Sequence, residues 1–173
     1  ALAQRVQGLL EAAGLPVAQD AQRGYDHGTF VPLAVMYPEA NVPVLQMSLR
    51  SGLDPAQHLA LGRALAMLRD EGVLIVGSGL SYHNLRAFGR AGQAPSQAFD
   101  TWLQAALAAT QAQRTQHLLD WEQAPAARLC HPREEHLLPL MVAVGAAEAD
   151  TATCIYHEDG IFGGVTASSF RFG

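Results

Sequence analysis

The sequence predicts an α/β domain in which a mixed or mostly parallel central sheet carries helices on both faces. Segments with apolar residues at helical spacing alternate along the chain with short apolar runs of strand length. The run Val73–Val76 is apolar at every position, which is typical of a central strand covered on both faces. Helix start and stop signals, such as Asp54-Pro55 and Gly72, separate the segments.

The first half of the chain is expected to contain two helices and three strands. Apolar residues recur at helical spacing over residues 2–13, and Gly14 ends that helix. Residues 15–18 are expected to form a brief strand and residues 42–49 a buried one. A second helix over residues 54–72 begins with an aspartate that caps it and leads into the central strand.

The second half is expected to contain two helices followed by two strands. Ser96 is a candidate cap for a long helix that reaches about Glu122, and a further helix covers residues 133–147. Two strands, near residues 152–157 and 164–171, close the chain. Residues 1–173 are therefore expected to form a single α/β domain.

Composition narrows the function classes. Of the 173 residues, 49% are hydrophobic and 16% are charged, against a typical charged share of about 25%, which excludes a disordered chain. The net charge is −5, and the eleven cationic residues, all Arg, are scattered singly, so no basic stripe predicts nucleic-acid binding. No apolar run approaches the roughly 18 residues of a membrane span. Cys130 and Cys154 make neither a disulfide framework nor a zinc cluster, which favours a reducing, cytoplasmic location.

His27 is the first candidate functional residue. It lies in the run Asp26-His27-Gly28, which predicts a loop with an imidazole beside a carboxylate. In that arrangement Asp26 sets the tautomer of His27 and raises its basicity. The alternative is a histidine that only bonds to the backbone of its loop.

His83 is the second candidate. It follows the predicted central strand, and ligands of open α/β sheets bind beyond the carboxyl ends of the strands. The intervening Gly77-Ser78-Gly79 resembles the start of a dinucleotide-binding fingerprint, but Tyr82 stands where the third glycine belongs, which disfavours a nucleotide site. An ordinary loop histidine is the alternative for His83.

His131 and His136 are five residues apart, which places them off a common helix face. Both are positioned to face a pocket near the start of the helix predicted over residues 133–147. Glu134 and Glu135 are explained by the preference of a helix N-terminus for negative charge.

The remaining candidates have simpler explanations. His157 and Glu158 indicate either a solvated turn or a metal-binding pair. Cys130 lies directly before a histidine, but adjacent side chains rarely align for nucleophilic catalysis. His58 and His117 lie on predicted helices and are expected to be at the surface or half-buried.

Several of these segments together resemble the class III extradiol ring-cleavage dioxygenases, specifically the branch similar to DOPA 4,5-dioxygenase. They occur in the order of that family and cover most of the chain. The matching stretches are Gly24–Leu33, Met36-Tyr37-Pro38, Val42–Leu49, Gly77–Leu85 and His131–Leu140.

The resemblance implies a non-haem Fe(II) site, sometimes loaded with zinc, that binds a catechol-type aromatic diol and O₂. It implies that His27 is the catalytic acid–base residue and that His83 is a metal ligand. It places His131 and His136 in the substrate pocket. No nucleic-acid or membrane partner is expected.

In this family two further metal histidines come from an N-terminal segment, and no histidine of this sequence carries its motif. Residues 1–173 are therefore expected to be the C-terminal part of a longer catalytic domain, or to receive the missing ligands from a partner chain. Two other functions stay open: a zinc-dependent hydrolase that uses the same site, because zinc also activates water, and a non-catalytic binding protein that keeps the fold.

Overall fold

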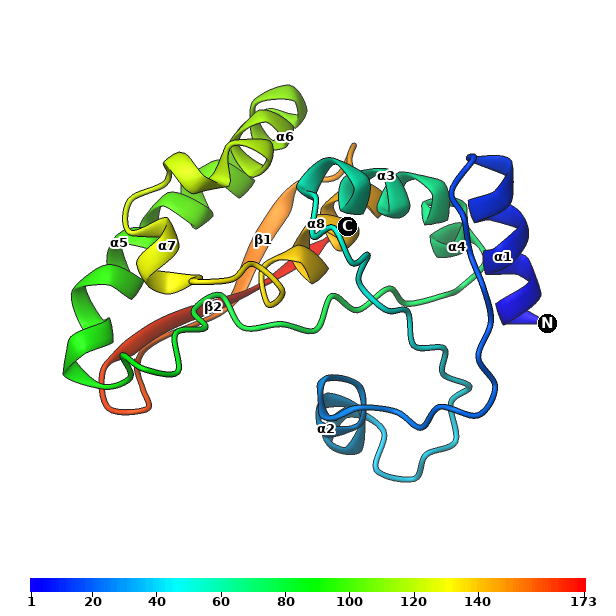
Figure 1. Ribbon diagram of the computed structural model, residues 1–173, viewed down its shortest axis with the longest axis horizontal. Coiled ribbons are helices and arrows are strands. Elements are labelled where there is room, and N and C mark those ends of the chain that lie inside the picture. Colours follow the sequence, from blue (N-terminus) through cyan, green and yellow to red (C-terminus); the bar gives the residue numbers. More distant parts are fainter.

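The computed structural model describes all 173 residues and shows a mixed α/β fold dominated by helices (Figure 1). The elements in chain order are α1 (Leu2–Ala12), α2 (His27–Met36), α3 (Pro55–Leu65), α4 (Met67–Asp70), α5 (Arg90–Ala108), α6 (Gln111–Leu119), the 3₁₀ helix η1 (Trp121–Gln123), α7 (Ala127–Cys130), α8 (Leu138–Ala146), β1 (Ala152–Ile161) and β2 (Val165–Phe172). No helix is long and apolar enough to cross a membrane.

The core lies where α5, α7 and α8 pack with the β1–β2 hairpin. Fifteen buried residues form one cluster there, including Phe99, Leu103, Trp121 and Met141. A smaller cluster joins α1 to α3 and α4. The chain between Leu10 and His58, in contrast, contains no buried residue.

Helices α3 and α8 approach so closely that only glycine fits between them. A Cβ atom on Gly62 would lie 2.1 Å from the carbonyl oxygen of Val142, and one on Gly145 would lie 2.2 Å from that of Leu59. The two backbones are therefore in direct contact, which fixes α8 and the residues just before it relative to α3.

Several local predictions are confirmed. The first helix ends where Gly14 adopts a positive φ, and the carboxylate of Asp54 accepts a hydrogen bond from the backbone N–H of Ala56 at the start of α3. The two C-terminal strands pair as an antiparallel hairpin, with Ala152 opposite Phe172.

Three helix boundaries differ from the prediction. The long helix breaks at Ala109, whose extended ψ of 170° separates α5 from α6. Ser96 lies inside α5 rather than at its start. Its hydroxyl accepts a hydrogen bond from the backbone N–H of Thr166. The last helix begins only at Leu138, because the preceding residues form turns.

The parallel central sheet is not formed among these residues, whose only sheet is the antiparallel hairpin. Residues 15–18, 42–49 and 73–76 are not helical and lie outside the sheet, so the three predicted strands are absent. A β-strand requires a neighbouring strand that completes its backbone hydrogen bonds. No other segment of the structure pairs in this way with residues 15–18, 42–49 or 73–76. Leu74 and Val76 are 64% and 49% exposed as a result.

Candidate functional site

His83, Glu135 and His136 come together at one place on the molecule. Each offers a ligand atom, and these atoms all lie within 4.8 Å of one another. The two imidazole rings stack with their centroids 3.4 Å apart and their planes 14° from parallel. Nδ1 of His83 lies 3.6 Å from a carboxylate oxygen of Glu135. Imidazole and carboxylate together are a donor set that divalent transition metals accept.

The backbone around this cluster explains how its members meet. The backbone N–H of His83 donates to the carbonyl of Cys130 at 2.9 Å, which joins the two segments. A Cβ atom on Gly79 would lie 2.2 Å from the carbonyl oxygen of His136, and one on Gly77 would lie 2.5 Å from that of Pro139. These glycines therefore serve close backbone packing, which accounts for the pattern that resembled a nucleotide fingerprint.

The donor atoms of the cluster fit a metal ion. Nδ1 of His136 and Oε2 of Glu135 are buried without a hydrogen-bond partner, although that oxygen lies 3.8 Å from Nε of Arg133. Such atoms are rare in folded proteins and call for a partner. Burial, and after it the nearby imidazole of His83, lower the pKa of His136. The ring therefore favours the neutral form, which is the form that coordinates metals.

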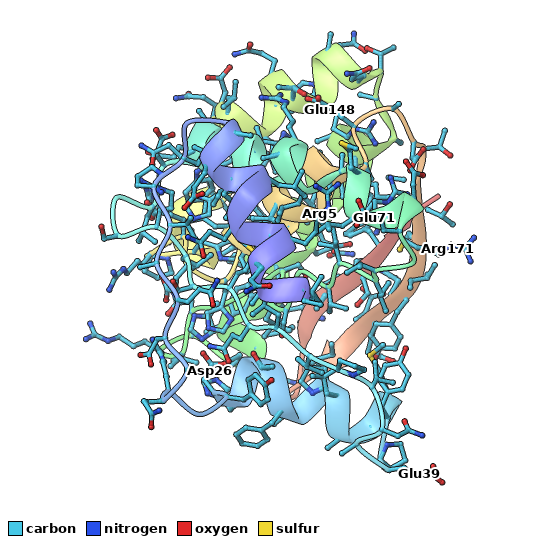
Figure 2. The ribbon with its side chains drawn as sticks, turned by 90° about the vertical axis from the view of Figure 1, so that its right-hand side faces the viewer. Arg5, Asp26, Glu39, Glu71, Glu148 and Arg171 are labelled. Carbon is cyan, nitrogen blue, oxygen red and sulfur yellow. The ribbon has the colours of Figure 1, made fainter.

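His27 opens α2 and is exposed, whereas the sequence predicts a loop at this position. Asp26 is the N-cap: its carboxylate accepts from the backbone N–H of Thr29 at 3.2 Å and from the side-chain amide of Gln46 at 3.0 Å. Figure 2 shows Asp26 at the N-terminal end of this helix. None of its hydrogen bonds goes to the His27 ring, so the pairing of these two side chains stays a prediction. His27 lies near enough to His136 to lower the pKa of that ring electrostatically.

His131 is completely buried behind the cluster. Its Nε2 lies 3.0 Å from the carbonyl oxygen of Ser81, and its ring packs edge-on against Phe99 and Trp121. Burial lowers the pKa of His131 to about 4, so the ring is neutral at physiological pH. Its role in substrate binding stays a prediction, and in this structure the ring is part of the core.

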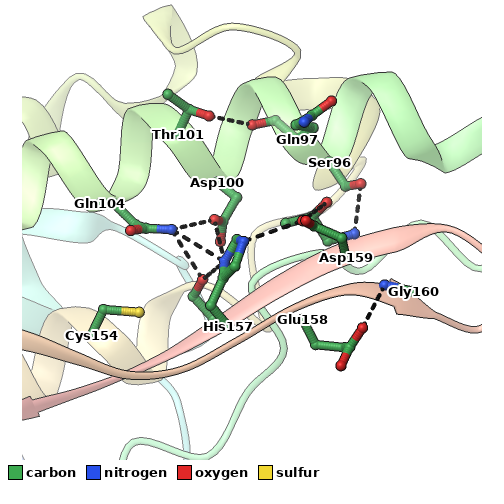
Figure 3. A network of polar contacts seen from close by, with 12 residues as sticks. Ser96, Gln97, Asp100, Thr101, Gln104, Cys154, His157, Glu158, Asp159 and Gly160 are labelled. Atoms are coloured by element: carbon green, nitrogen blue, oxygen red, sulfur yellow. Dashed lines mark hydrogen bonds and ion pairs between the residues drawn. The ribbon is translucent and has the colours of Figure 1, made fainter.

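His157 belongs to a second polar cluster, on the face of β1 that meets α5 (Figure 3). Its Nδ1 lies 3.3 Å from a carboxylate oxygen of the buried Asp100, and its Nε2 lies 3.2 Å from one of Asp159. The carboxylate of Glu158 bonds instead to the backbone N–H of Gly160. His157 and Glu158 therefore do not form a metal pair. Strand alternation is the signal that places His157 and Asp159 on the same face.

The structure also describes the surroundings of Cys130 and His58. Burial raises the pKa of the Cys130 thiol to about 12, which argues against a nucleophilic role. His58 is fully buried rather than at the surface, and its ring bonds to the backbone of Asp54 and Arg50.

Glu135 is the site residue that sequence reasoning missed. Its position before a predicted helix was explained by the helix dipole, yet the helix starts three residues later and its carboxylate faces the two histidines. The available signal was its adjacency to His136, which is weak on its own.

Curated proteins with similar sequences match nearly the whole chain. The chain is 43% identical to 4,5-DOPA dioxygenase extradiol of Beta vulgaris over 175 aligned positions, which cover 99% of this chain and 65% of that protein. It is 45% identical to the same-named protein of Portulaca grandiflora, covering 90% of this chain and 59% of the relative. The chain thus spans less than two thirds of the length of these curated relatives.

Structure and family comparisons agree with this result. The crystal structure of an uncharacterized protein from Escherichia coli K12 superimposes with a TM-score of 0.88 at 34% identity, covering 100% of this chain and 72% of that one. The model of the family described as catalytic LigB subunit of aromatic ring-opening dioxygenase matches residues 1–173. The chain belongs to this family of ring-opening dioxygenases.

Proposed function

We propose that this chain carries part of the metal site of an extradiol dioxygenase that opens the ring of a catechol-type aromatic with O₂. The observation that supports this most directly is the cluster of His83, Glu135 and His136, in which Nδ1 of His136 is buried without a hydrogen-bond partner. Family membership supplies the reaction class. Fe(II) is the proposed metal, and zinc is a possible occupant in purified protein because the same donor types bind it.

We assign His83 as a metal ligand, with His136 and Glu135 as the neighbouring donors. The sequence resemblance placed His136 in the substrate pocket, and its position beside His83 is compatible with either role. A bound ferrous ion would supply open positions for the diol and for O₂. His83, His136 and Glu135 would hold that ion, while the buried His131 lies in the core nearby.

His27 is the proposed acid–base residue. An imidazole is the side chain that exchanges protons near neutral pH, and the ring of His27 is exposed at the end of α2 that lies toward His136. It is thus free to take a proton from a hydroxyl of the diol and to return one later in the reaction. This role requires that α2 keeps a fixed position relative to His83 and His136.

The remaining metal histidines are proposed to come from an N-terminal segment of a longer catalytic domain or from a partner chain. Two observations support such a neighbour. The segments 42–49 and 73–76 lack strand partners, and apolar side chains such as Leu45, Met47 and Leu74 are exposed along them. A covering segment that paired with them would complete the mostly parallel sheet predicted from the sequence.

Metal binding by variants of the histidines tests the site. His83→Ala and His136→Ala should each weaken Fe(II) or Zn(II) binding by at least 10–100-fold, because removal of a ligand costs no less than removal of a supporting residue. His117→Ala, on the exposed face of α6, is the matched control and should bind as the wild type does. Unchanged far-UV circular dichroism would show that the fold is intact. Full metal binding by both site variants would refute the assignment.

Turnover tests the reaction. The anaerobically prepared, iron-loaded holoenzyme should consume O₂ when a catechol is added. His27→Phe should retain iron and lose about 10²–10⁴-fold in turnover. Loss of iron from this variant would instead make His27 a ligand. Zinc binding without O₂ consumption would favour the hydrolase, and absence of any bound metal would favour a non-catalytic binding protein.

A further inference from the structure

Helix α2 is attached to the rest of the molecule mainly by hydrogen bonds. None of its residues is buried, and Val35 is 81% exposed. Figure 1 shows this helix apart from the other helices, at the end of two long connections. Apolar packing therefore contributes little to its position, although the proposed function requires His27 to stay close to His83 and His136.

One group of bonds organises the N-terminal end of α2 locally. The side chain of Gln46 accepts from the backbone N–H of Asp26 at 3.1 Å and from the hydroxyl of Thr29 at 2.8 Å, and it donates to the carboxylate of Asp26. Gln46, however, lies in the segment 42–49, which itself has no strand partner. These bonds fix the shape of the helix start without fixing its place relative to the metal cluster.

A single hydrogen bond joins α2 to the segment that carries His83. The hydroxyl of Ser78 donates to the carbonyl oxygen of Gly28, the residue that follows His27, at 2.5 Å. No other hydrogen bond links residues 25–37 to any residue beyond Gln46. The position of His27 relative to the cluster therefore depends on Ser78.

The surroundings of Ser78 make it a rigid point of attachment. On either side of it, Gly77 and Gly79 lie directly against the backbone of Pro139 and His136, with room for no Cβ atom. The segment is thus packed directly against the backbone that carries His136. Ser78 thus connects His27 on one side with the residues that place His136 on the other.

We propose that Ser78 is a positioning residue whose hydrogen bond to Gly28 sets His27 at a fixed distance from His83 and His136. The inference rests on the proposed function for its catalytic consequence, since it assigns Ser78 to the acid–base step through His27. A displacement of about 1 Å at a reacting group costs up to about 10²-fold in rate. Loss of this bond should therefore impair proton transfer and leave metal binding intact.

Hydrogen exchange of the backbone amides tests the attachment without any assay of activity. In Ser78→Ala, peptides that cover residues 25–37 should exchange about fivefold faster, which corresponds to one net hydrogen bond of about 1 kcal/mol. Ser51→Ala is the matched control, because Ser51 is exposed in a turn and its side chain makes no hydrogen bond. Unchanged exchange of residues 25–37 in Ser78→Ala would overturn the proposal, whether or not the protein proves to be a dioxygenase.

A double-mutant cycle in the iron-loaded holoenzyme tests the catalytic consequence. Ser78→Ala should keep its iron and lose about 10–10²-fold in kcat, and Ser78→Thr, which keeps a hydroxyl, should recover most of that loss. In a His27→Ala background, Ser78→Ala should cost nothing further, because Ser78 acts through His27. Additive losses, or loss of iron from Ser78→Ala, would overturn the proposal. A wild-type protein that lacks ring-opening activity would refute the proposed function and leave the exchange result to decide the attachment.

Discussion

The two sides of the candidate site differ sharply in how they are held. His83 and His136 come from segments packed on the core of α5, α7, α8 and the hairpin, which contains fifteen buried residues. His27 comes from the stretch between Leu10 and His58, in which no residue is buried. The proposed metal ligands thus lie on a rigid base, and the proposed acid–base residue lies on a helix positioned by polar contacts. Because so little packing holds α2, the place of His27 relative to the metal donors depends on a few polar contacts, the bond from Ser78 to Gly28 among them.

The largest expected contrast is between the two cysteines. Cys130 is buried in the core and its pKa is raised to about 12, so only roughly one thiol in 10⁴ is ionised at pH 8. Cys154 is exposed on β1. In native protein, iodoacetamide should modify Cys154 at least about 10³-fold faster than Cys130, as measured by mass spectrometry of the tryptic peptides. Denatured protein is the control and should show similar rates. Similar rates in native protein would mean that the packed region opens readily.

The second contrast compares truncation of a core side chain with truncation in α2. Met141→Ala removes a fully buried side chain from α8 and should lower the free energy of unfolding by about 2–5 kcal/mol. Val35→Ala removes one that is 81% exposed and should change it by less than about 0.5 kcal/mol. Urea denaturation followed by circular dichroism measures both. A large effect of Val35→Ala would show that α2 is packed against something other than the described residues.

These contrasts also separate what the sequence predicts from what it does not. Signals that act within a few residues are confirmed: the Asp54 cap, the Gly14 stop and the presence of two C-terminal strands, whose antiparallel pairing the structure adds. The sheet predicted around Val73–Val76 is not formed, because strand pairing depends on a second segment that local pattern does not specify. The break at Ala109 is missed for another reason: neither Gly nor Pro lies near it to signal a helix end.

The sequence predicts the site residues that stand in recognisable local motifs, and it does not predict contacts between residues far apart in the chain. His27 and His83 were identified from their motifs, and the structure gives them different surroundings: a helix N-terminus for one and a stacked histidine for the other. The approach of Glu135 to His83 joins residues 52 positions apart, which no spacing rule connects. Likewise, the burial of His58 depends on the packing of α3 against α8, and the link between Asp100 and His157 depends on the packing of α5 against β1. A pattern within one helix reveals neither.

The smallest expected contrast compares two glycines in helices. Gly62→Ala would bring a Cβ atom within 2.1 Å of the backbone of α8, and because the obstructing atom is a backbone oxygen the helices must separate. We expect the free energy of unfolding to fall by about 1–3 kcal/mol, the usual cost of overpacking. Gly8→Ala in α1, where no atom lies within 4 Å, should instead raise it by up to about 1 kcal/mol, since alanine favours the helix. Opposite signs in urea denaturation would confirm that α3 and α8 meet backbone to backbone. Stabilisation by both substitutions would mean that the contact between α3 and α8 is looser than the structure indicates. The support of His136 by α8 would then be looser too.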